Sequence, residues 1–412
     1  MRRVVITGIG AVTPLGNDIE TTWKGLTEKR SGIGPITKFD PAGLSVRIAG
    51  ELKYFPAEHY ISKKEIQRLD PFIHYAVAAS VMAADDAGLP AGADGRSAVL
   101  ENAGIVIGSG RGGITNMGNG LQKHLLHGKP FSAYLMSSTT INMASSAVSM
   151  KFGIKGPALG ISTACASGAN AIGEAFRMIR SGEIDIAFAG GTEAPLCRLA
   201  VGGYASSGAL SGRNNAPRKA SRPFDKDRDG FVISEGAAIL VIEELDHALK
   251  RRSRIYAELT GYGMSSDAFH QTKPHSEGEA SAIKKALTDA GLSAENIDYI
   301  NAHATSSPLG DLAESVAIRE VFGKKADDIR VSSSKSMLGH MLGAAGAVEA
   351  AITAMSIDRE TIIPTINLEN PDPACGLNHV TSTIDKKITA AITNSFGFGG
   401  ANAVLVLKKF KR

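Results

Sequence analysis

The sequence predicts an α/β fold, and three observations lead to this prediction. The chain has 412 residues, of which 43% are hydrophobic, so it can bury one large core or two of medium size. Glycine is abundant, at 46 residues, whereas aromatic residues make up only 6%, which suits tight turns and close helix-to-sheet packing better than an all-β sandwich. Short β-branched segments bounded by glycine alternate with alanine-rich helical segments, which is the pattern of repeated βαβ units.

Eight of these segments are predicted to be strands. They are residues 4–9, 105–107, 184–189, 239–242, 256–260, 299–302, 329–332 and 403–407. The second series resembles a loose repeat of the first, because each contains a strand that leads through serines into a helix of small residues. We therefore expect an internal duplication that brings two helix starts together at the centre, one carrying Cys165 and the other near His340.

Net charge and cysteine content exclude several classes of protein. The formal net charge is +4, from 45 basic and 41 acidic side chains, which is too small an excess for a dedicated nucleic-acid-binding protein. The three cysteines, Cys165, Cys197 and Cys375, form no CxxC pair, so we expect neither a disulfide framework nor a zinc site, and we assign Cys197 and Cys375 to packing. The apolar run after Met1 breaks at Thr7, as in a first strand rather than a signal peptide, and no segment is apolar over the length of a bilayer. We expect a cytoplasmic protein with no membrane or nucleic-acid partner.

Cys165 is the candidate nucleophile. It lies between a strand-like segment and a helix-like run at residues 169–178, so we expect its sulfur at a helix N-terminus, where the macrodipole favours the thiolate. Its neighbours Ala164, Ala166 and Gly168 are small, which lets a thioester approach and leaves backbone N–H groups to hold an oxyanion. On these residues alone, a buried structural cysteine is an equally weighted alternative.

Two histidines and two acids are candidates for supporting roles. His303 follows an apolar strand on a turn, where catalytic groups of open α/β sheets tend to lie, and His340 stands at a predicted helix start with Lys335 just upstream. Each histidine taken separately is more commonly a structural residue. Asp311 and Glu314 would share one helical face and could hold a lysine or cap a turn, with a solvated face as the alternative.

The glycine-rich segment at residues 108–113 formally matches GxGxxG, the dinucleotide-binding fingerprint. That fingerprint expects an acidic residue about 20 positions downstream to bind the ribose. No Asp or Glu occurs at residues 102–173, so a nicotinamide-dependent dehydrogenase is a poor interpretation. The same stretch is basic, and part of it is a candidate positive surface.

Four short motifs lie in the order and at the spacing of one enzyme family. They are Ser-Thr-Ala-Cys-Ala-Ser-Gly at residues 162–168, Asn-Ala-His at 301–303, Lys-Ser-Met-Leu-Gly-His at 335–340 and Asn-Ser-Phe-Gly-Phe-Gly-Gly at 394–400. Together they resemble the elongating β-ketoacyl-[acyl-carrier-protein] synthases, most closely the synthase II group of bacterial fatty-acid synthesis. The similarity covers essentially the whole chain and includes residues 5–10 and 221–225.

The resemblance implies an architecture. It implies the thiolase fold, in which two duplicated halves form five αβαβα layers, and it implies a homodimer. We expect residues 1–253 to form the half that carries Cys165, and residues 254–412 to form the half that carries both His303 and His340.

The resemblance also implies a reaction, the decarboxylative Claisen condensation of an acyl thioester with malonyl-[acyl-carrier-protein] in fatty-acid chain elongation. Cys165 would take the acyl group, and the backbone N–H groups of Cys165 and Phe398 would form the oxyanion hole. His303 and His340 would donate N–H groups to the malonyl thioester and stabilise the enolate formed as carbon dioxide leaves. Lys335 would order the site by pairing with an acid such as Glu314 rather than act as a base. No metal ion or redox cofactor is needed.

Binding surfaces follow from the same resemblance. The residues expected to contact the substrate are Arg111, Thr272, Thr305, Ser307 and Phe398. The implied partner is the acyl carrier protein in its acyl- and malonyl-loaded forms, and its acidic helix would complement a basic surface. The residues expected to form that surface are Lys63, Lys64, Arg68, Lys123 and Lys129, for which ordinary solvated side chains are the alternative.

Four residues depart from the family's usual pattern. Ala304 replaces a glycine, Ser307 replaces a threonine but keeps a hydroxyl, Arg111 stands where an apolar residue near the acyl pocket is frequent, and Gly208 replaces an arginine that some relatives use toward the carrier. These departures leave the chain-length preference and the docking surface open.

Two alternative functions remain from the sequence. A polyketide ketosynthase uses similar machinery, because motifs around the nucleophile do not define the acyl chain. A non-catalytic partner subunit like the chain-length factors belongs to a different class, and the intact Cys165 weighs against it. The pair of histidines weighs against a degradative thiolase and against the His-Asn initiating synthases.

Overall fold

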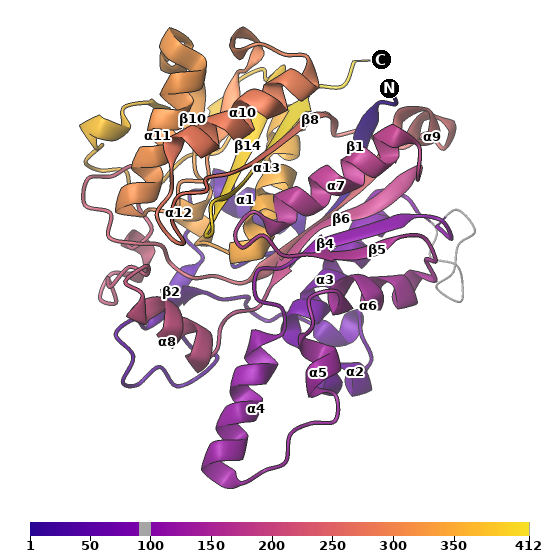
Figure 1. Ribbon diagram of the computed structural model, residues 1–412, viewed down its shortest axis with the longest axis vertical. Coiled ribbons are helices and arrows are strands. Elements are labelled where there is room, and N and C mark those ends of the chain that lie inside the picture. The colour runs from indigo at the N-terminus through magenta and orange to yellow at the C-terminus, as the bar shows by residue number, and fades with distance from the viewer. Residues whose placement is uncertain (90–99, 412) are drawn as a thin grey trace.

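Two sheets alternate with three layers of helices in the computed structural model, which describes residues 1–89 and 100–411 (Figure 1). The first sheet has the order β5 (Ala158–Ile161), β4 (Gly104–Gly108), β6 (Ile186–Glu193), β7 (Gly236–Glu244) and β1 (Val4–Val12). The second has the order β8 (Ala257–Ser266), β15 (Ala401–Lys408), β14 (Ala390–Gly397), β9 (Tyr299–Asn301), β10 (Arg330–Ser332) and β12 (Asn378–His379). Residues 4–6 of β1 pair with residues 257–259 of β8, so hydrogen bonding continues through all eleven strands.

The two sheets repeat one pairing pattern, as the sequence predicts. In the first, β5, β4 and β6 are parallel, and β7 and β1 follow antiparallel. In the second, β10, β9 and β14 are parallel, and β15 and β8 follow antiparallel. Each of these strands therefore has a counterpart. In particular β5, which precedes Cys165, corresponds to β10, which precedes Lys335.

The helices complete an αβαβα stack. Helices α3 (Pro71–Asp86) and α6 (Met143–Phe152) cover the outer face of the first sheet. Helix α10 (Ser276–Ala290) packs on β8 and β15 at the outer face of the second sheet, and α11 (Pro308–Phe322) packs on α10. Helices α7 (Ser167–Ser181) and α13 (Ala345–Arg359) lie between the sheets. The predicted α/β class and the five thiolase-like layers are confirmed.

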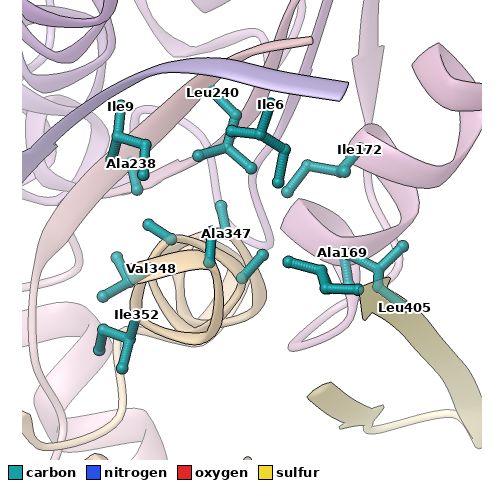
Figure 2. Packing of buried hydrophobic residues seen from close by; sticks show 14 of the residues in the cluster. Ile6, Ile9, Ala169, Ile172, Ala238, Leu240, Ala347, Val348, Ile352 and Leu405 are labelled. Atoms are coloured by element: carbon teal, nitrogen blue, oxygen red, sulfur yellow. The ribbon is translucent and has the colours of Figure 1, made fainter. Parts of the chain in front are cut away.

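The central layer is held by small and apolar side chains. Figure 2 shows Ala347, Val348 and Ile352 of α13 among side chains of both sheets, including Leu240 and Leu405. The two central helices approach closely, because a Cβ added at Gly168 of α7 would lie 3.0 Å from the Ala347 nitrogen of α13. Burial of apolar area at about 25 cal/mol per Å² is the main force that holds such a layer in place.

The remaining elements surround this stack. The other helices are α1 (Ile19–Thr27), α2 (Lys63–Arg68), α4 (Ile114–His127), α5 (Leu135–Thr139), α8 (Arg198–Ser206), α9 (Leu245–Lys250) and α12 (Lys335–Leu338). The other strands are β2 (Ile33–Pro35), β3 (Ile48–Gly50), β11 (Thr361–Ile362) and β13 (Ile384–Asp385). Short 3-10 helices span Ala57–His59, Pro217–Lys219, Ala294–Asn296, Gly323–Asp327, Leu342–Ala344 and Pro373–Cys375. Over residues 1–89 and 100–411, no helix combines the length and apolar content that crossing a bilayer requires.

All eight predicted strands are present, most of them longer than predicted. Three strands of the main sheets, β5, β12 and β14, were not among the predicted strands. Strands β5 and β12 have only four and two residues and lie at the two sheet edges. Strand β14 contains Thr393, Asn394 and Ser395, three consecutive buried polar residues that hide the apolar pattern of a core strand.

Candidate active site

The turn between β5 and α7 presents Cys165 to a pocket. Ala164 has a left-handed backbone (φ 51°), which bends the chain sharply before the cysteine. The Ser167 hydroxyl accepts from the Thr163 N–H at 2.9 Å, and the Asn170 amide donates to the Thr163 hydroxyl at 2.6 Å, so the turn is tied down on both sides. Cys165 is 9% exposed, at the end of a pocket of about 430 Å³. A thioester can reach this sulfur although the residue counts as buried.

Several segments that are far apart in the sequence line the same pocket. Those of the expected site residues that line it are Cys165, Thr272, His303, Thr305, Ser307, His340 and Phe398. The aromatic and aliphatic side chains of Tyr204, Phe231 and Leu342 add an apolar wall that the sequence reasoning did not identify. The pocket therefore combines a polar part with an apolar part, as a thioester with an acyl chain requires.

His303 and His340 meet beside the sulfur. The Nε2 atom of His340 lies 3.1 Å from the Sγ atom of Cys165. The two imidazole rings are 5.4 Å apart between centroids and nearly perpendicular, at 87°. Burial, followed by the Lys335 ammonium, lowers the pKa of both histidines well below the usual 6.5. Both rings are therefore neutral at neutral pH, and each can present one N–H donor and one acceptor.

Lys335 holds one of these rings and pairs with an unexpected acid. Its ammonium lies 3.5 Å from Nδ1 of His303, where an ammonium can only donate, so Nδ1 accepts and the proton of this ring lies on Nε2. The same ammonium forms a buried ion pair with Glu349 on α13. The expected pairing of Lys335 with Glu314 is wrong, because the Glu314 oxygens accept from the backbone N–H groups of His303 and Ala304 and from the Asn394 amide.

Glu314 and Asp311 are buried on α11 and brace the loop after β9. Glu314 accepts from the backbone N–H groups of His303 and Ala304 at 2.8 and 2.7 Å. Asp311 accepts from the N–H groups of Ser306 at 3.0 Å and Phe224 at 2.8 Å. Buried carboxylates that each accept several N–H bonds fix a backbone strongly. These acids therefore position His303 and do not form the solvated face that was the alternative.

Burial dominates the chemistry of the nucleophile. It raises the pKa of the Cys165 thiol to about 11, although Lys335 and the backbone N–H of Phe398 act in the opposite direction. The expected preference for the thiolate is therefore wrong, because α7 begins at Ser167 and the desolvation of the sulfur outweighs the favourable charges around it. The free enzyme holds a thiol beside His340, which is placed to accept its proton.

The turn between β14 and β15 also lies against Cys165. A Cβ at Gly397 would lie 3.1 Å from the Cys165 nitrogen, so only glycine lets the two backbones come this close. The Phe398 N–H is directed at the Cys165 sulfur and lowers its pKa. The Phe398 side chain is 37% exposed at the pocket.

The glycine-rich segment 108–113 joins β4 to α4, as a dinucleotide fingerprint would. The hydrogen-bond donors of this segment are already bonded to a side chain of the protein. The Ser109 hydroxyl and the N–H groups of Gly110 and Arg111 donate to the Glu193 carboxylate at 2.8, 2.7 and 3.0 Å. A carboxylate of the chain itself occupies the place of a pyrophosphate, which agrees with the rejection of a nicotinamide site.

Arg111 is not among the residues that line the pocket with Cys165. Its side chain is exposed, and its Nε donates to the Tyr204 hydroxyl at 2.8 Å. Tyr204 does line the pocket. Arg111 therefore lies behind Tyr204 and not at the pocket wall, so the described pocket does not support its expected direct contact with the substrate.

The five basic residues of the expected docking surface lie on or next to α2 and α4, which extend from the same end of the molecule (Figure 1). Those with exposed side chains are Lys63, Lys64, Lys123 and Lys129. The Arg68 guanidinium lies 4.3 Å from the centroid of the Tyr134 ring, which links α2 to the segment before α5. None of the five lines the pocket.

Glu349 and Glu193 are the functional-site residues that sequence reasoning missed. Glu349 is an isolated acid between Ala344 and Ile357, a run otherwise made of small and apolar residues with two hydroxyls, and that isolation was a usable signal. Glu193 also accepts from the Gly343 N–H at 2.9 Å and so connects the β4 loop to the turn after His340. Its sequence context, Gly-Gly-Thr-Glu at the end of a strand, carried no such signal.

A larger hollow, of about 800 Å³, lies elsewhere, lined by residues of the 31–54 and 216–219 segments. Its walls contain neither a cysteine nor a histidine. The smaller pocket at Cys165 is therefore the reactive one.

Comparisons with known proteins agree with this geometry. The family model "Beta-ketoacyl synthase, N-terminal domain" matches residues 1–248, and "Beta-ketoacyl synthase, C-terminal domain" matches residues 256–369. A 3-oxoacyl-[acyl-carrier-protein] synthase 2 of Synechocystis sp. is 46% identical over 415 residues, covering 100% of this chain and 99% of the relative. The solved ishigamide ketosynthase/chain length factor has a TM-score of 0.92 at 38% identity, covering 100% of both chains. A type II polyketide ketosynthase in complex with its acyl-carrier protein has a TM-score of 0.89 at 34% identity, covering 99% of this chain and 100% of that chain.

Proposed function

Because this chain belongs to the β-ketoacyl synthase family and is a condensing acyltransferase of fatty-acid elongation, we propose that its reaction runs through Cys165, His303 and His340. The observation that carries the proposal is the 3.1 Å contact of His340 Nε2 with Cys165 Sγ, in a pocket that His303 also lines. A chain-length-factor-like subunit has no use for such a contact.

In the first half-reaction, the Cys165 thiol attacks the carbonyl carbon of an acyl thioester on the carrier. Neutral His340 accepts the thiol proton at Nε2 as the carbon–sulfur bond forms. The N–H groups of Cys165 and Phe398 receive the oxyanion, and the tetrahedral adduct expels the carrier thiolate, which takes the proton. The products are acyl-Cys165 and the free carrier thiol.

In the second half-reaction, malonyl-carrier enters the same pocket. The Nε2–H of His303, fixed by the Lys335 contact at Nδ1, binds the malonyl thioester oxygen. His340 binds the same oxygen through Nε2–H, in the tautomer that it takes once Cys165 is acylated and no thiol proton faces Nε2. Carbon dioxide leaves, the resulting enolate carbon attacks acyl-Cys165, and the adduct releases the β-ketoacyl-carrier and the Cys165 thiolate, which takes up a proton. The two histidines accelerate this step because their donors face the oxygen that gains negative charge.

Mass spectrometry of the intact protein tests this assignment. We expect wild type to gain the acyl mass on incubation with acyl-carrier, and to lose it as β-ketoacyl-carrier when malonyl-carrier is added. We expect His303→Ala to gain the acyl mass but to release product about 10²- to 10³-fold more slowly, because one enolate donor is missing. A wild-type protein that is never acylated would support the non-catalytic alternative, and a fully active His303→Ala variant would remove His303 from the mechanism.

Fatty-acid and polyketide condensing enzymes differ in the acyl chain that they accept. The apolar wall of Tyr204, Phe231 and Leu342 supports a saturated acyl group, and the comparison at highest identity reported above is to a fatty-acid synthase. In the same mass-spectrometry experiment, we expect the enzyme to turn over a saturated acyl-carrier and to turn over a poly-β-ketoacyl-carrier poorly.

A second copy of the chain is the expected partner of the free edge of the first sheet. Strand β5 is the last in the strand order, so one side of its backbone has no partner strand within the described residues. Residues 158–160 are exposed, and Leu159 is 46% exposed. Apolar side chains of the neighbouring helices are exposed as well, among them Leu125, Met136 and Met150. An open apolar strand edge requires a cover, and an antiparallel pairing of two β5 strands supplies one.

We predict that wild type sediments at twice the 43.0 kDa chain mass and that Leu159→Lys shifts it toward the monomer. A buried lysine charge at a two-fold axis would face its own copy, which opposes association. Leu249→Lys is the matched control, since Leu249 has a similar exposure of 44% on α9 and should leave the mass unchanged. Analytical ultracentrifugation measures the mass, and a monomeric wild type would contradict the proposal.

Three further assignments remain predictions. The carrier is expected to dock on the surface that includes Lys63, Lys64 and Lys123, whose positive charge suits an acidic partner. The division into halves at residues 253 and 254 and a cytoplasmic location are also unchanged expectations.

A further inference from the structure

An acid with no evident structural role lines the reactive pocket. Glu279 stands in the first turn of α10, is 1% exposed, and shares the pocket with Cys165. Its Oε2 atom is buried and has no hydrogen-bond partner among residues 1–89 and 100–411. A buried polar atom without a partner destabilises a protein, so its retention at a pocket wall points to a ligand.

The neighbours of Glu279 offer it no positive charge. The charged groups that face it are the carboxylates of Asp267, beyond β8, and of Asp311 and Glu314, on α11. Burial, and then these three carboxylates, raise the pKa of Glu279 well above its usual 4.5. Asn402 of β15 also lines this part of the pocket, but its amide donates to Asp267 at 2.6 Å. Burial among three carboxylates therefore favours the protonated form of Glu279, which has one O–H donor to offer.

The surrounding acids are already satisfied. Asp267 accepts from Asn402 and from the His275 N–H at 3.2 Å, and Glu314 accepts the N–H groups of the His303 loop. The oxygens of Asp267 and Glu314 already accept hydrogen bonds within the protein, whereas the carboxyl O–H of Glu279 has no acceptor among the described residues. The missing partner is therefore a hydrogen-bond acceptor that enters the pocket.

The acceptors of the two substrates are few. A saturated acyl chain offers none, and the thioester oxygen belongs to the oxyanion hole and the two histidines. The malonyl carboxylate is negatively charged and would be repelled by Asp267, Asp311 and Glu314 around Glu279. The thiol arm through which a carrier delivers its acyl group contains amide carbonyls, which accept an O–H in a narrow pocket. We propose that Glu279 is a substrate-binding residue whose carboxyl O–H donates to an amide carbonyl of this arm. The proposal rests on the thioester chemistry proposed above for Cys165.

Steady-state kinetics with acyl- and malonyl-carrier test the proposal through three variants. Glu279→Leu removes the donor, and we expect KM to rise about tenfold while kcat stays within about twofold, because one hydrogen bond is lost from the bound arm. Glu279→Gln keeps an N–H donor and should stay within about threefold of wild type. Glu277→Leu, an exposed acid on the same turn of α10, should be unchanged. A thermal unfolding scan identifies any variant that fails to fold. If Glu279→Leu does not fold, the pH dependence of KM in Glu279→Gln still tests the proposal.

The pH dependence separates a hydrogen-bond donor from a packing role. Since burial and the neighbouring carboxylates raise the pKa of Glu279, its proton is lost at a higher pH than that of an ordinary glutamate. KM of wild type should therefore rise toward alkaline pH, and this rise should be absent in Glu279→Gln, whose amide does not ionise. An identical alkaline rise in both proteins would overturn the proposal.

A truncated substrate distinguishes this proposal from the assignment of Cys165. Acylation by an octanoyl thioester of a simple alkyl thiol, followed by intact mass, involves no amide arm. We expect wild type and Glu279→Leu to acylate at equal rates with this probe, but at rates about tenfold apart with acyl-carrier at subsaturating concentration. An equal penalty on both probes would overturn the role of Glu279 and leave Cys165 as the nucleophile. A wild type that neither probe acylates would overturn the proposed function itself, and with it the role of Glu279.

Discussion

Replacing Cys165 by alanine is expected to lower condensation about 10⁵- to 10⁶-fold, the loss typical when a covalent nucleophile is removed. The sulfur is the only atom of the pocket placed against His340 at hydrogen-bond distance, and without it no acyl-enzyme can form. The measurement is the formation of β-ketoacyl-carrier from acyl-carrier and malonyl-carrier. Decarboxylation of malonyl-carrier should persist in this variant, because both histidines and Lys335 remain.

The other two cysteines provide matched controls for this prediction. Cys197 and Cys375 are as buried as Cys165, but neither lines the pocket. Cys197→Ala and Cys375→Ala should keep condensation within about twofold, with only the loss in stability expected of a small core truncation, on the order of 1 kcal/mol. Condensation by Cys165→Ala at a rate near that of wild type would rule out covalent catalysis at this residue.

Removing Lys335 should have the largest effect on stability. Lys335→Ala leaves Glu349 buried without its partner, and breaking one side of a buried pair destabilises by about 3–5 kcal/mol. Burial raises the pKa of Glu349 above its ordinary value, and the Lys335 ammonium opposes that rise, so the variant should bind a proton there to relieve part of the loss. Urea unfolding at neutral pH measures the free energy of unfolding.

The same substitution should lower condensation for a separate reason. Without the donor at Nδ1, His303 is free to place its proton on either ring nitrogen, and only the Nε2–H form serves the enolate. The double variant Lys335→Met, Glu349→Gln separates the two effects, since it removes the unpaired charge and should recover most of the stability while condensation stays low. Full activity of the double variant would show that Lys335 acts only through the ion pair.

The chain's pattern predicted most strands of the sheets, and the family resemblance pointed to the candidate reactive residues. Alternating β-branched and alanine-rich segments predicted eight strands that are all present, because period and propensity are local properties. Cys165, His303, His340 and Lys335 were found from motifs, and all four meet at one place. The missed strands β5, β12 and β14 lack a clear apolar pattern, since the first two are short and the third carries buried polar residues.

Long-range packing decided what the pattern left open. The partner of Lys335 is Glu349 and not Glu314, because α13 enters between the sheets while α11 stays outside and gives its acids to the His303 loop. Burial of Cys165 raises its pKa, whereas the sequence suggested only the favourable helix start. Nothing in the sequence distinguished Glu279 from other helical acids, whereas the structure places it, buried, at the wall of the pocket with Cys165. Ion pairing, desolvation and access depend on neighbours supplied by distant segments, and their distances exist only once those segments have packed together.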